Sequence, residues 1–232
     1  MKLSVLFLAA LGSVPLVFSQ TTVDGPFKIR YASNLINGGD AVVNITNTGA
    51  SATATGYGAG GPGAPPQNNI NGNLCVNIYT FAADEQEVAC CACLITPNAL
   101  WSASVKTALL NSTLTPAFPN EVVIKLVSTV PSTTATGGQN CNPAAIDQSA
   151  TIAATPGFLA NGLLAWGTST HGTPTATGPT FRISETAFVS SNVSRAELQR
   201  SVQECQFIQI LGSGQFGICK GCSNVGLGAV AQ

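Results

Sequence analysis

The chain is organised around Cys90-Cys91-Ala92-Cys93-Leu94-Ile95-Thr96-Pro97-Asn98, in which three of its eight cysteines fall within four residues of an apolar run. The run has the composition of a β-strand, and successive side chains of a strand point to opposite faces. Cys91 and Cys93 would therefore share one face, while Cys90 projects from the other. We expect a strand that is tied to the rest of the chain on both of its sides.

The start of the chain has the pattern of a secretory signal peptide. Lys2 supplies a positive charge, residues 3–18 are an apolar segment, and Val17-Phe18-Ser19 offers small or apolar residues where a signal peptidase cleaves. We expect residues 1–19 to be removed and residues 20–232 to form one mature domain. The predicted location is therefore extracellular or periplasmic.

A retained membrane anchor is the alternative interpretation of this segment. Pro15 interrupts the apolar residues, and an anchor needs about twenty of them in a row. The most apolar later stretch, residues 152–166, is broken by Pro156, Gly157, Asn161 and Gly162. We therefore expect a released protein that has no membrane partner.

Secretion determines how the cysteines are interpreted. In an oxidising compartment an even number of cysteines predicts structural disulfides. The cysteines are Cys75, Cys90, Cys91, Cys93, Cys141, Cys205, Cys219 and Cys222. Eight cysteines can pair in many ways, and the sequence does not select one of them.

Two other interpretations of the thiols remain open. Zinc binds four Cys or His ligands from two spaced pairs, and Cys219 and Cys222 could complete the cluster at residues 90–93. The same two cysteines have the spacing of a redox pair, although they open no helix that would lower a thiol pKa. Because secreted thiols pair by default, we predict disulfides, with no bound metal and no cofactor.

The composition excludes several functions. Only 8% of the residues are charged, against roughly a quarter in an average soluble domain, and the net charge is −1. A surface with so few charges is built from Thr, Ser, Asn, Gln and Gly, and it offers no field that would attract DNA, RNA or anionic lipid. Such a surface suits contact with carbohydrate or self-association.

Short strands between turn signals dominate the mature chain. Residues 75–81 and 88–95 form the clearest hairpin, which the acidic turn 83–87 closes. In residues 121–127, Val122, Ile124 and Leu126 share one face of a strand and Glu121 and Lys125 lie on the other, which predicts a strand with one buried face. Residues 99–110 predict a short helix.

Further strands and one long helix are predicted after residue 160. The strands, residues 162–167 and 181–183, flank a loop over residues 168–179. Ser194-Arg195-Ala196-Glu197 is a capping box, which marks the start of a helix that Gly212 ends. The apolar stripe of this helix consists of Leu198, Val202, Cys205 and Ile208.

No group of residues predicts catalysis, and we assign no catalytic residue. His171 is the only histidine, and without a Gly-x-Ser-x-Gly motif we expect it to be an exposed loop residue. Asp84, Glu85 and Glu87 could act as a glycosidase pair, but on a hairpin turn they are expected to be solvated charges. Residues 212–217 match a dinucleotide fingerprint without the crossover helix and acidic partner that it needs.

Several motifs together resemble a group of uncharacterised secreted bacterial proteins. They are Cys90-Cys91-Ala92-Cys93 followed by Thr96-Pro97-Asn98-Ala99-Leu100, Ala165-Trp166-Gly167 with His171, Phe207-Ile208-Gln209, and Gly217-Ile218-Cys219-Lys220-Gly221-Cys222. The resemblance covers most of the mature chain and implies no activity, cofactor or ligand. A bacterial origin would make the glycosylation sequons at Asn44, Asn111 and Asn192 incidental.

These features predict a mainly β fold: a disulfide-stapled, sandwich-like single domain with one long helix near its C-terminus. The expected function is that of a non-enzymatic extracellular protein that binds a surface, a polysaccharide or copies of itself, with no nucleic-acid partner. The alternative is a secreted hydrolase that acts on extracellular polymers through carboxylates. A cleft joining two carboxylates would favour the hydrolase, and a flat aromatic or Thr/Asn-rich sheet would favour binding.

Overall fold

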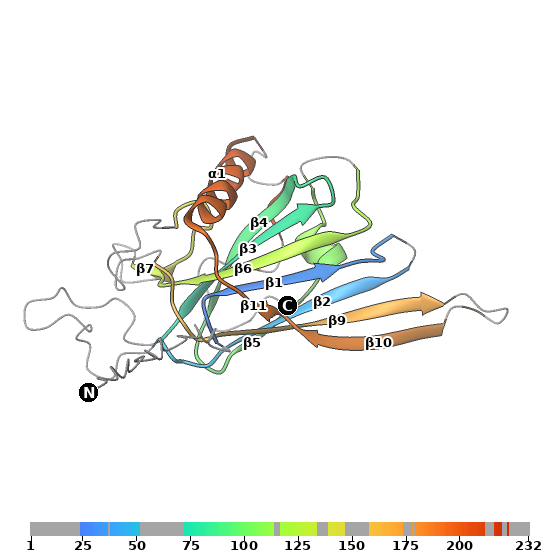
Figure 1. Ribbon diagram of the computed structural model, residues 1–232, viewed down its shortest axis with the longest axis horizontal. Helices are drawn as coiled ribbons and strands as arrows, with labels where there is room; N and C mark the ends of the chain where they lie inside the picture. The colour runs from blue at the N-terminus through green and yellow to red at the C-terminus, as the bar shows by residue number, and fades with distance from the viewer. Residues whose placement is uncertain are drawn as a thin grey trace, which may run out of the picture.

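The structure, a computed structural model, describes residues 24–36, 38–51, 72–113, 117–133, 139–146, 158–173, 178, 180–211, 216–219 and 222. Two antiparallel sheets pack face to face around a shared core, and one helix covers the outer face of the larger sheet (Figure 1). The predicted mainly β, disulfide-stapled, sandwich-like fold with a helix near the C-terminus is confirmed. The predicted signal peptide lies outside the described residues.

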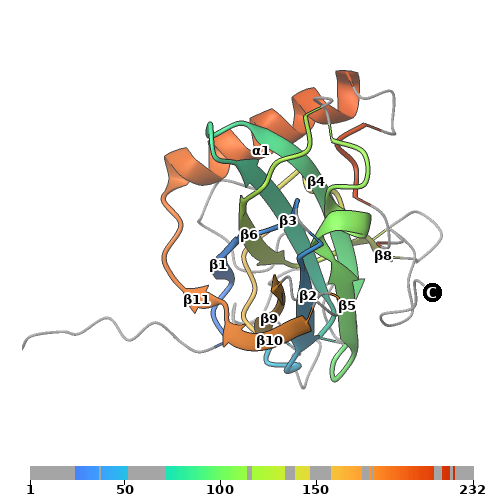
Figure 2. The ribbon, with the colours of Figure 1, turned by 90° about the vertical axis from the view of Figure 1, so that its right-hand side faces the viewer.

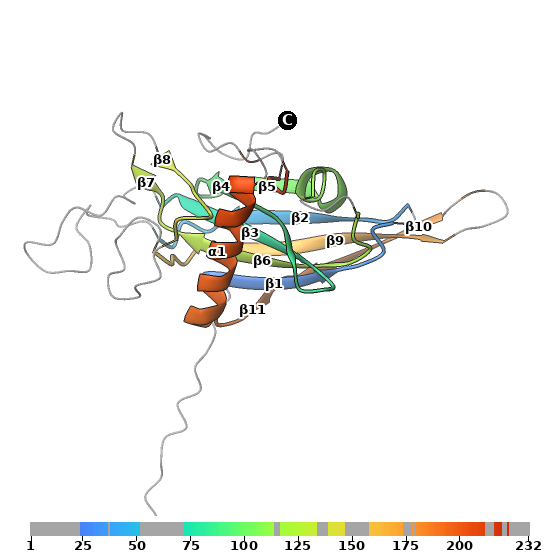
Figure 3. The same cartoon turned by 90° about the horizontal axis from the view of Figure 1, so that it is seen from above.

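The larger sheet has five strands in the order β11, β1, β6, β3 and β4. Their bounds, in that order, are Val189–Ser190, Phe27–Ala32, Val122–Thr129, Leu74–Ala82 and Glu87–Ile95. The helix α1, Arg195–Leu211, crosses over these strands, as Figure 3 shows from above. No helix in the described part of the chain is long and apolar enough to cross a membrane.

The smaller sheet has four strands in the order β10, β9, β2 and β5. Their bounds are Thr180–Ala187, Leu163–Thr173, Asp40–Asn47 and Leu100–Ser104. A short π-helix, η1, spans Val105–Leu109, and a small hairpin pairs β7, Ser132–Thr133, with β8, Gln139–Asn140. Figure 2 shows the two sheets nearly edge-on, with α1 on the side away from the smaller sheet.

The predicted β3–β4 hairpin lies between the smaller sheet and α1. Both strands are buried along almost their whole length, because one face of the larger sheet packs on the smaller sheet and the other packs beneath α1. Cys91 and Cys93 lie in the core between the sheets, whereas Cys90 lies in the core beneath α1. The prediction that these cysteines point to opposite faces is therefore confirmed.

Large aliphatic side chains fill the space between the sheets. The fully buried ones include Ile45, Leu74, Ile78, Ile124, Leu126 and Leu163. Burying a side chain of this size contributes about 1.5–3 kcal/mol relative to leaving it exposed. The core beneath α1 contains the predicted helix stripe, Leu198, Val202, Cys205 and Ile208, packed on Phe27, Tyr79 and Val127.

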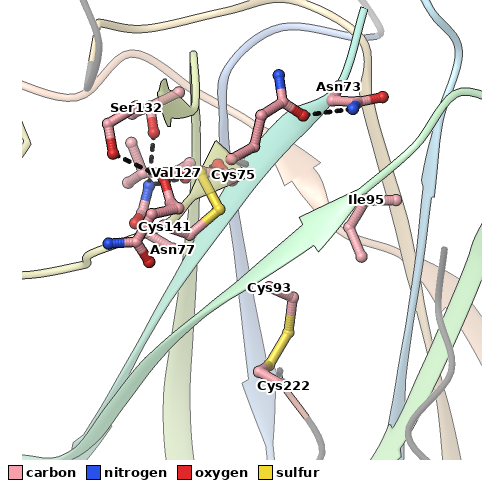
Figure 4. The surroundings of a disulfide bond; sticks show 12 residues. Asn73, Cys75, Asn77, Cys93, Ile95, Val127, Ser132, Cys141 and Cys222 are labelled. Atoms are coloured by element: carbon pink, nitrogen blue, oxygen red, sulfur yellow. Dashed lines mark hydrogen bonds between the residues drawn. A yellow bond between two sulfur atoms is a disulfide. The ribbon is translucent and has the colours of Figure 1, made fainter. Parts of the chain in front are cut away.

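All eight cysteines are paired. The bridges are Cys75–Cys141, Cys90–Cys205, Cys91–Cys219 and Cys93–Cys222, of which Figure 4 shows the first and the last. Three of them start on β4, and they lead to α1 and to the segment that follows it. The cluster at residues 90–93 therefore presents disulfide sulfurs rather than the thiolates that zinc would need. Cys219 and Cys222 are bonded to Cys91 and Cys93 and not to each other, so they do not form a redox pair.

The start of α1 has one of the two hydrogen bonds of the predicted capping box. The Ser194 hydroxyl accepts a hydrogen bond from the Glu197 backbone N–H at 3.1 Å. The carboxylate of Glu197 instead forms an ion pair with Lys125 on β6. The residue that should have completed the cap thus ties the helix to the sheet.

The helix predicted over residues 99–110 is largely wrong. Residues 100–104 form strand β5, in which Trp101 and Ala103 are buried between exposed residues and which pairs with β2 along its whole length. Only the single turn η1 follows, and the Ser104 hydroxyl caps it by accepting a hydrogen bond from the Thr107 N–H at 3.0 Å. Pairing with β2 outweighs the local preference of this segment for a helix.

The loop predicted over residues 168–179 is also wrong in its first half. β9 continues to Thr173, and its polar end pairs residue by residue with β10. The segment lacks the alternation of a half-buried strand because part of it lies beyond the core. Backbone pairing with β10, and with β2 as far as Thr170, makes it a strand.

Candidate binding face and buried carboxyl cluster

The outer face of the smaller sheet carries a set of polar side chains that interact across the strands. On β9, Leu163, Ala165 and Gly167 point inward and are buried, so Leu164, Trp166 and Thr168 lie on the outer face. The strand pairing places Asn44 and Ser102 on the same outer face of β2 and β5, and Glu185 on that of β10. The face therefore combines one tryptophan with hydroxyl, amide and carboxylate groups.

A row of side-chain hydrogen bonds crosses all four strands of this face. The Ser102 hydroxyl donates to Asn44 Oδ1 at 2.7 Å, and Asn44 Nδ2 donates to Thr168 Oγ1 at 3.2 Å. Thr168 Oγ1 then donates to Glu185 Oε1 at 3.1 Å. Each donor points the same way, from β5 towards β10, so each bond polarises the next. We call Ser102, Asn44, Thr168 and Glu185 the polar row.

The polar row ends in exposed groups on both sides. Ser102 and Glu185 are exposed, whereas Thr168 is half-buried and Asn44 is buried. The carboxylate at one end and the hydroxyl at the other retain lone pairs for a ligand that donates hydrogen bonds. Trp166 is half-buried beside the row, where its cross-strand neighbours are Asn44 and Ala187.

Asp40, the first residue of β2, links neighbouring strands of the smaller sheet through hydrogen bonds. Its carboxylate accepts hydrogen bonds from the Ser104 hydroxyl at 2.6 Å and from the Lys106 N–H at 3.1 Å. Its backbone N–H donates to Thr170 Oγ1 at 2.9 Å, and its carbonyl accepts from that hydroxyl at 3.0 Å. β2, β5 and β9 are thus held together by side chains as well as by the backbone ladder.

His171 does not lie in a loop as predicted. It is a half-buried residue of β9, directly opposite Arg182 of β10, and its Nε2 lies 3.3 Å from Ser184 Oγ. The error follows from the underestimated length of β9. Among the described residues, no carboxylate is a hydrogen-bond partner of this imidazole.

Glu87 contradicts the prediction of three solvated carboxylates. Asp84 and Glu85 are exposed in the hairpin turn as expected, but Glu87 opens β4 beneath α1 and is only 6% exposed. Neither carboxylate oxygen has a hydrogen-bond partner within the described residues. Burial, with the negative charge of Glu204 as the second cause, raises the pKa of Glu87 to about 9. Glu87 is therefore a neutral carboxylic acid at ordinary pH.

Charged groups of β6 and α1 surround this carboxyl. Arg200 donates to Glu204 at 2.8 Å, and the second oxygen of Glu204 is buried without a partner among the described atoms. The ammonium group of Lys125 lies 4.0 Å from the centre of the Phe81 ring, and the guanidinium of Arg200 lies 5.9 Å from the same centre. The Glu87 carboxyl also lies within 4.8 Å of the sulfurs of Cys90 and Cys205, which are bonded to each other and so are not free ligands.

A cavity of about 380 Å³ lies beside the disulfides. Its lining includes at least one cysteine of every bridge, together with Asn140, Asn142, Pro143, Gln209 and Ile218. None of its described lining residues is acidic or basic. This cavity therefore does not join the two carboxylates that a glycoside hydrolase would need.

The sequons lie in different surroundings. Both polar atoms of the Asn44 amide are engaged in the polar row, which argues against a glycan on that nitrogen. Asn111 Oδ1 is buried, whereas Asn192 is exposed just before α1.

The polar row was not predicted from the sequence. Its one local signal is the run of Thr and Ser in residues 168–170, which has the composition of a loop. Comparisons with family models, with curated proteins and with solved structures find no match to this chain. The function must therefore be inferred from the geometry of the molecule itself.

Proposed function

We propose that the protein is a secreted, non-enzymatic extracellular protein that binds a polysaccharide through the outer face of its smaller sheet. The four disulfides indicate an oxidising environment, which fits an extracellular location. The observation that carries the proposal is the polar row, Ser102, Asn44, Thr168 and Glu185, beside Trp166.

The polar row has the chemistry that sugar hydroxyls need. Its members are fixed by one another before a ligand arrives, so little side-chain entropy is lost when hydroxyls bind at its exposed ends. Glu185 and Ser102 both keep acceptor capacity, which matches the many hydroxyl donors of a glycan. A neighbouring tryptophan offers an apolar ring face with a polar edge, against which the C–H face of a sugar can pack.

The charge of the protein favours a neutral polysaccharide. Charged residues make up 8% of the chain, and the row contributes a single carboxylate. An anionic polymer would meet no compensating basic group in the polar row, since Asn44, Thr168 and Ser102 are uncharged. We therefore expect a neutral glycan and an affinity that changes little with salt.

The alternative of a carboxylate-dependent hydrolase has less support. Asp84 and Glu85 lie in an exposed turn, and Glu87 is enclosed beneath α1 next to the Cys90–Cys205 bridge. A general acid must reach the bond that it protonates. Among the three carboxylates that the hypothesis named, Glu87, whose pKa burial raises, is the least accessible.

A binding experiment with two aromatic variants tests the proposal. The purified protein is sedimented with insoluble neutral polysaccharides, such as cellulose and chitin, and run through gels that contain soluble β-glucans. Trp166→Ala should weaken binding by about tenfold or more, the scale of one aromatic anchor. Phe207→Ala removes an aromatic ring that is 56% exposed on α1 and should leave binding unchanged.

A second pair of variants separates the polar row from the tryptophan. Glu185→Gln keeps the shape of the acceptor at the end of the row but removes its charge, and it should weaken binding less than Glu185→Ala. Thermal unfolding of each variant shows whether the sheet is intact. Equal binding by wild type, Trp166→Ala and Glu185→Ala, or no binding to any neutral glycan, would refute the proposal.

A further inference from the structure

β10 is an edge strand that the described part of the chain leaves open on one side. It pairs with β9 over all eight of its residues, and none of the described strands lies against its other edge. All eight residues are exposed, with Phe181 at 56% and Ile183 at 69%. The strand projects with β9 away from the helix-covered end of the molecule (Figure 1).

The usual protections of a sheet edge are weak in this strand. Edge strands avoid pairing with other chains through proline, bulges, short length or closely spaced charges. β10 contains no proline, its register with β9 shows no shift, and its two charged residues, Arg182 and Glu185, point to opposite faces. The backbone N–H and C=O groups on its outer edge, which pair with none of the described strands, and its two large apolar side chains therefore form a template for one more strand.

We infer that β10 pairs with β10 of a second copy of this chain, antiparallel and around a two-fold axis. The pairing rests on this edge alone and does not depend on the proposed ligand. A two-fold axis perpendicular to the sheet keeps the outer faces of both copies on the same side. Residues whose side chains lie on the same face of the sheet then face each other across the axis. Odd-numbered residues of one β10 therefore lie opposite odd-numbered residues of the other, and even-numbered residues lie opposite even-numbered ones.

The two charges restrict the register of this pairing. Centring the axis on Arg182 would set that cation against its own copy, and centring it on Glu185 would do the same for the carboxylate. Centring it on Ile183 avoids both: Ile183 meets Ile183, and Arg182 meets Ser184. Phe181 then meets Glu185 directly and lies diagonal to Ile183, within reach of its side chain. This register gathers four apolar side chains around the axis.

The overall charge does not oppose such a dimer. The chain carries a net charge of −1, and the two charged residues of β10 cancel each other. The paired strands would join the two smaller sheets into one continuous sheet. Both polar rows would then face the same side, which would give a repetitive polymer two adjacent places to bind.

Measurement of the solution mass tests this inference without any ligand. Size-exclusion chromatography with light scattering, from low to high micromolar protein, should show a monomer that converts to a dimer in the wild type. Ile183→Lys places a charge at the axis on an exposed position, so it should stay monomeric with an unchanged circular dichroism spectrum. Val189→Lys is the matched control: it changes a residue that is 64% exposed on β11, the edge strand of the other sheet, and should dimerise like wild type.

Hydrogen exchange locates the contact. Backbone amides of residues 180–187 should gain protection as the wild-type concentration rises, and they should not do so in Ile183→Lys. A wild type that stays monomeric throughout overturns the inference. So does a dimer that Ile183→Lys leaves intact, or one that Val189→Lys also abolishes, because neither would be held by β10.

Discussion

The guanidinium of Arg30 occupies the space that a side chain at Gly167 would need. Arg30 lies on β1 of the larger sheet, and Gly167 lies on β9 of the smaller one. The guanidinium donates to the Thr186 carbonyl at 2.9 Å and to the Ser169 hydroxyl at 2.8 Å, and it lies 5.9 Å from the centre of the Phe188 ring. A polar contact therefore joins the two sheets beside Gly167 and Thr186.

Gly167→Ala should displace Arg30 and lower the free energy of unfolding. A Cβ at position 167 would overlap the guanidinium, so Arg30 would lose its contacts with Thr186 and Ser169. Hydrogen bonds from a charged donor are worth about 1.5–3 kcal/mol each when buried and less at a partly exposed site, so we expect a loss of about 1–3 kcal/mol. Urea unfolding measures it.

A double-mutant cycle shows whether the cost arises from this pair. Arg30→Ala should destabilise the protein by itself, and the addition of Gly167→Ala to it should cost almost nothing more. Additive losses from the two substitutions would mean that Gly167 is required for a reason other than Arg30.

Glu87 should make the stability of the protein fall as the pH rises. Its pKa is raised from 4.5 to about 9 in the folded state, so between these values the folded protein holds a proton that the unfolded chain has lost. Stability from the neutral carboxyl is complete below about pH 4.5 and is lost as the pH rises through about 9. The expected slope is about 1.4 kcal/mol per pH unit over this window.

Glu87→Gln should remove this part of the pH dependence, because the amide has the same shape and does not ionise. Glu85→Gln is the matched control, since Glu85 is exposed in the adjoining turn and should leave the slope as it is in wild type. Unfolding curves from pH 5 to pH 9 measure both. Parallel curves for wild type and Glu87→Gln would contradict the burial of this carboxyl.

Ser194→Ala should lower the free energy of unfolding by about 0.5–2 kcal/mol. The substitution removes the hydroxyl that accepts a hydrogen bond from the Glu197 N–H at the start of α1. Ser194→Asp should restore most of the loss, because a carboxylate accepts the same bond and suits a helix N-terminus. If the denaturant midpoint of Ser194→Ala matches that of wild type, the hydroxyl does not cap the helix.

The protein should contain no free thiol. Thiol titration of denatured, unreduced protein should give none, because all eight cysteines are bridged. Replacing Cys90 and Cys205 together by alanine should cost about 2–5 kcal/mol, the range for removal of a native disulfide. Two or more free thiols per chain in wild type would contradict the pairing.

Features that depend on neighbouring residues can be predicted well from the sequence. The β3–β4 hairpin follows from two strand-like runs on either side of a turn. The opposite faces of Cys90 and Cys91 and the apolar stripe of α1 follow from the periods of a strand and of a helix. Ser194 marks the start of α1 because a cap is a local interaction. In each case the same short segment carries the signal and forms the structure.

Features that depend on distant segments were not predicted. In the sequence Glu87 belongs to a segment with the composition of an exposed turn. It is buried because α1, more than a hundred residues later in the chain, packs over it, and no local pattern indicates where that helix packs. The polar end of β9 lacks a strand pattern because backbone pairing with β10, and with β2 as far as Thr170, stabilises it. The polar row joins residues from four strands whose order in the sheet is not written in any one of them.

The three disulfides of β4 can form only after their distant partners have been synthesised. Their partners follow 115, 128 and 129 residues later, so a chain synthesised at roughly 5–20 residues per second would carry Cys90, Cys91 and Cys93 adjacent and without their partners for roughly 6–26 s. Neighbouring thiols readily form mixed or wrong disulfides, which only exchange can correct. Correct pairing would thus depend on thiol–disulfide exchange, and recombinant material made without an exchange catalyst would contain scrambled isomers whose β4 is tied to the wrong segments.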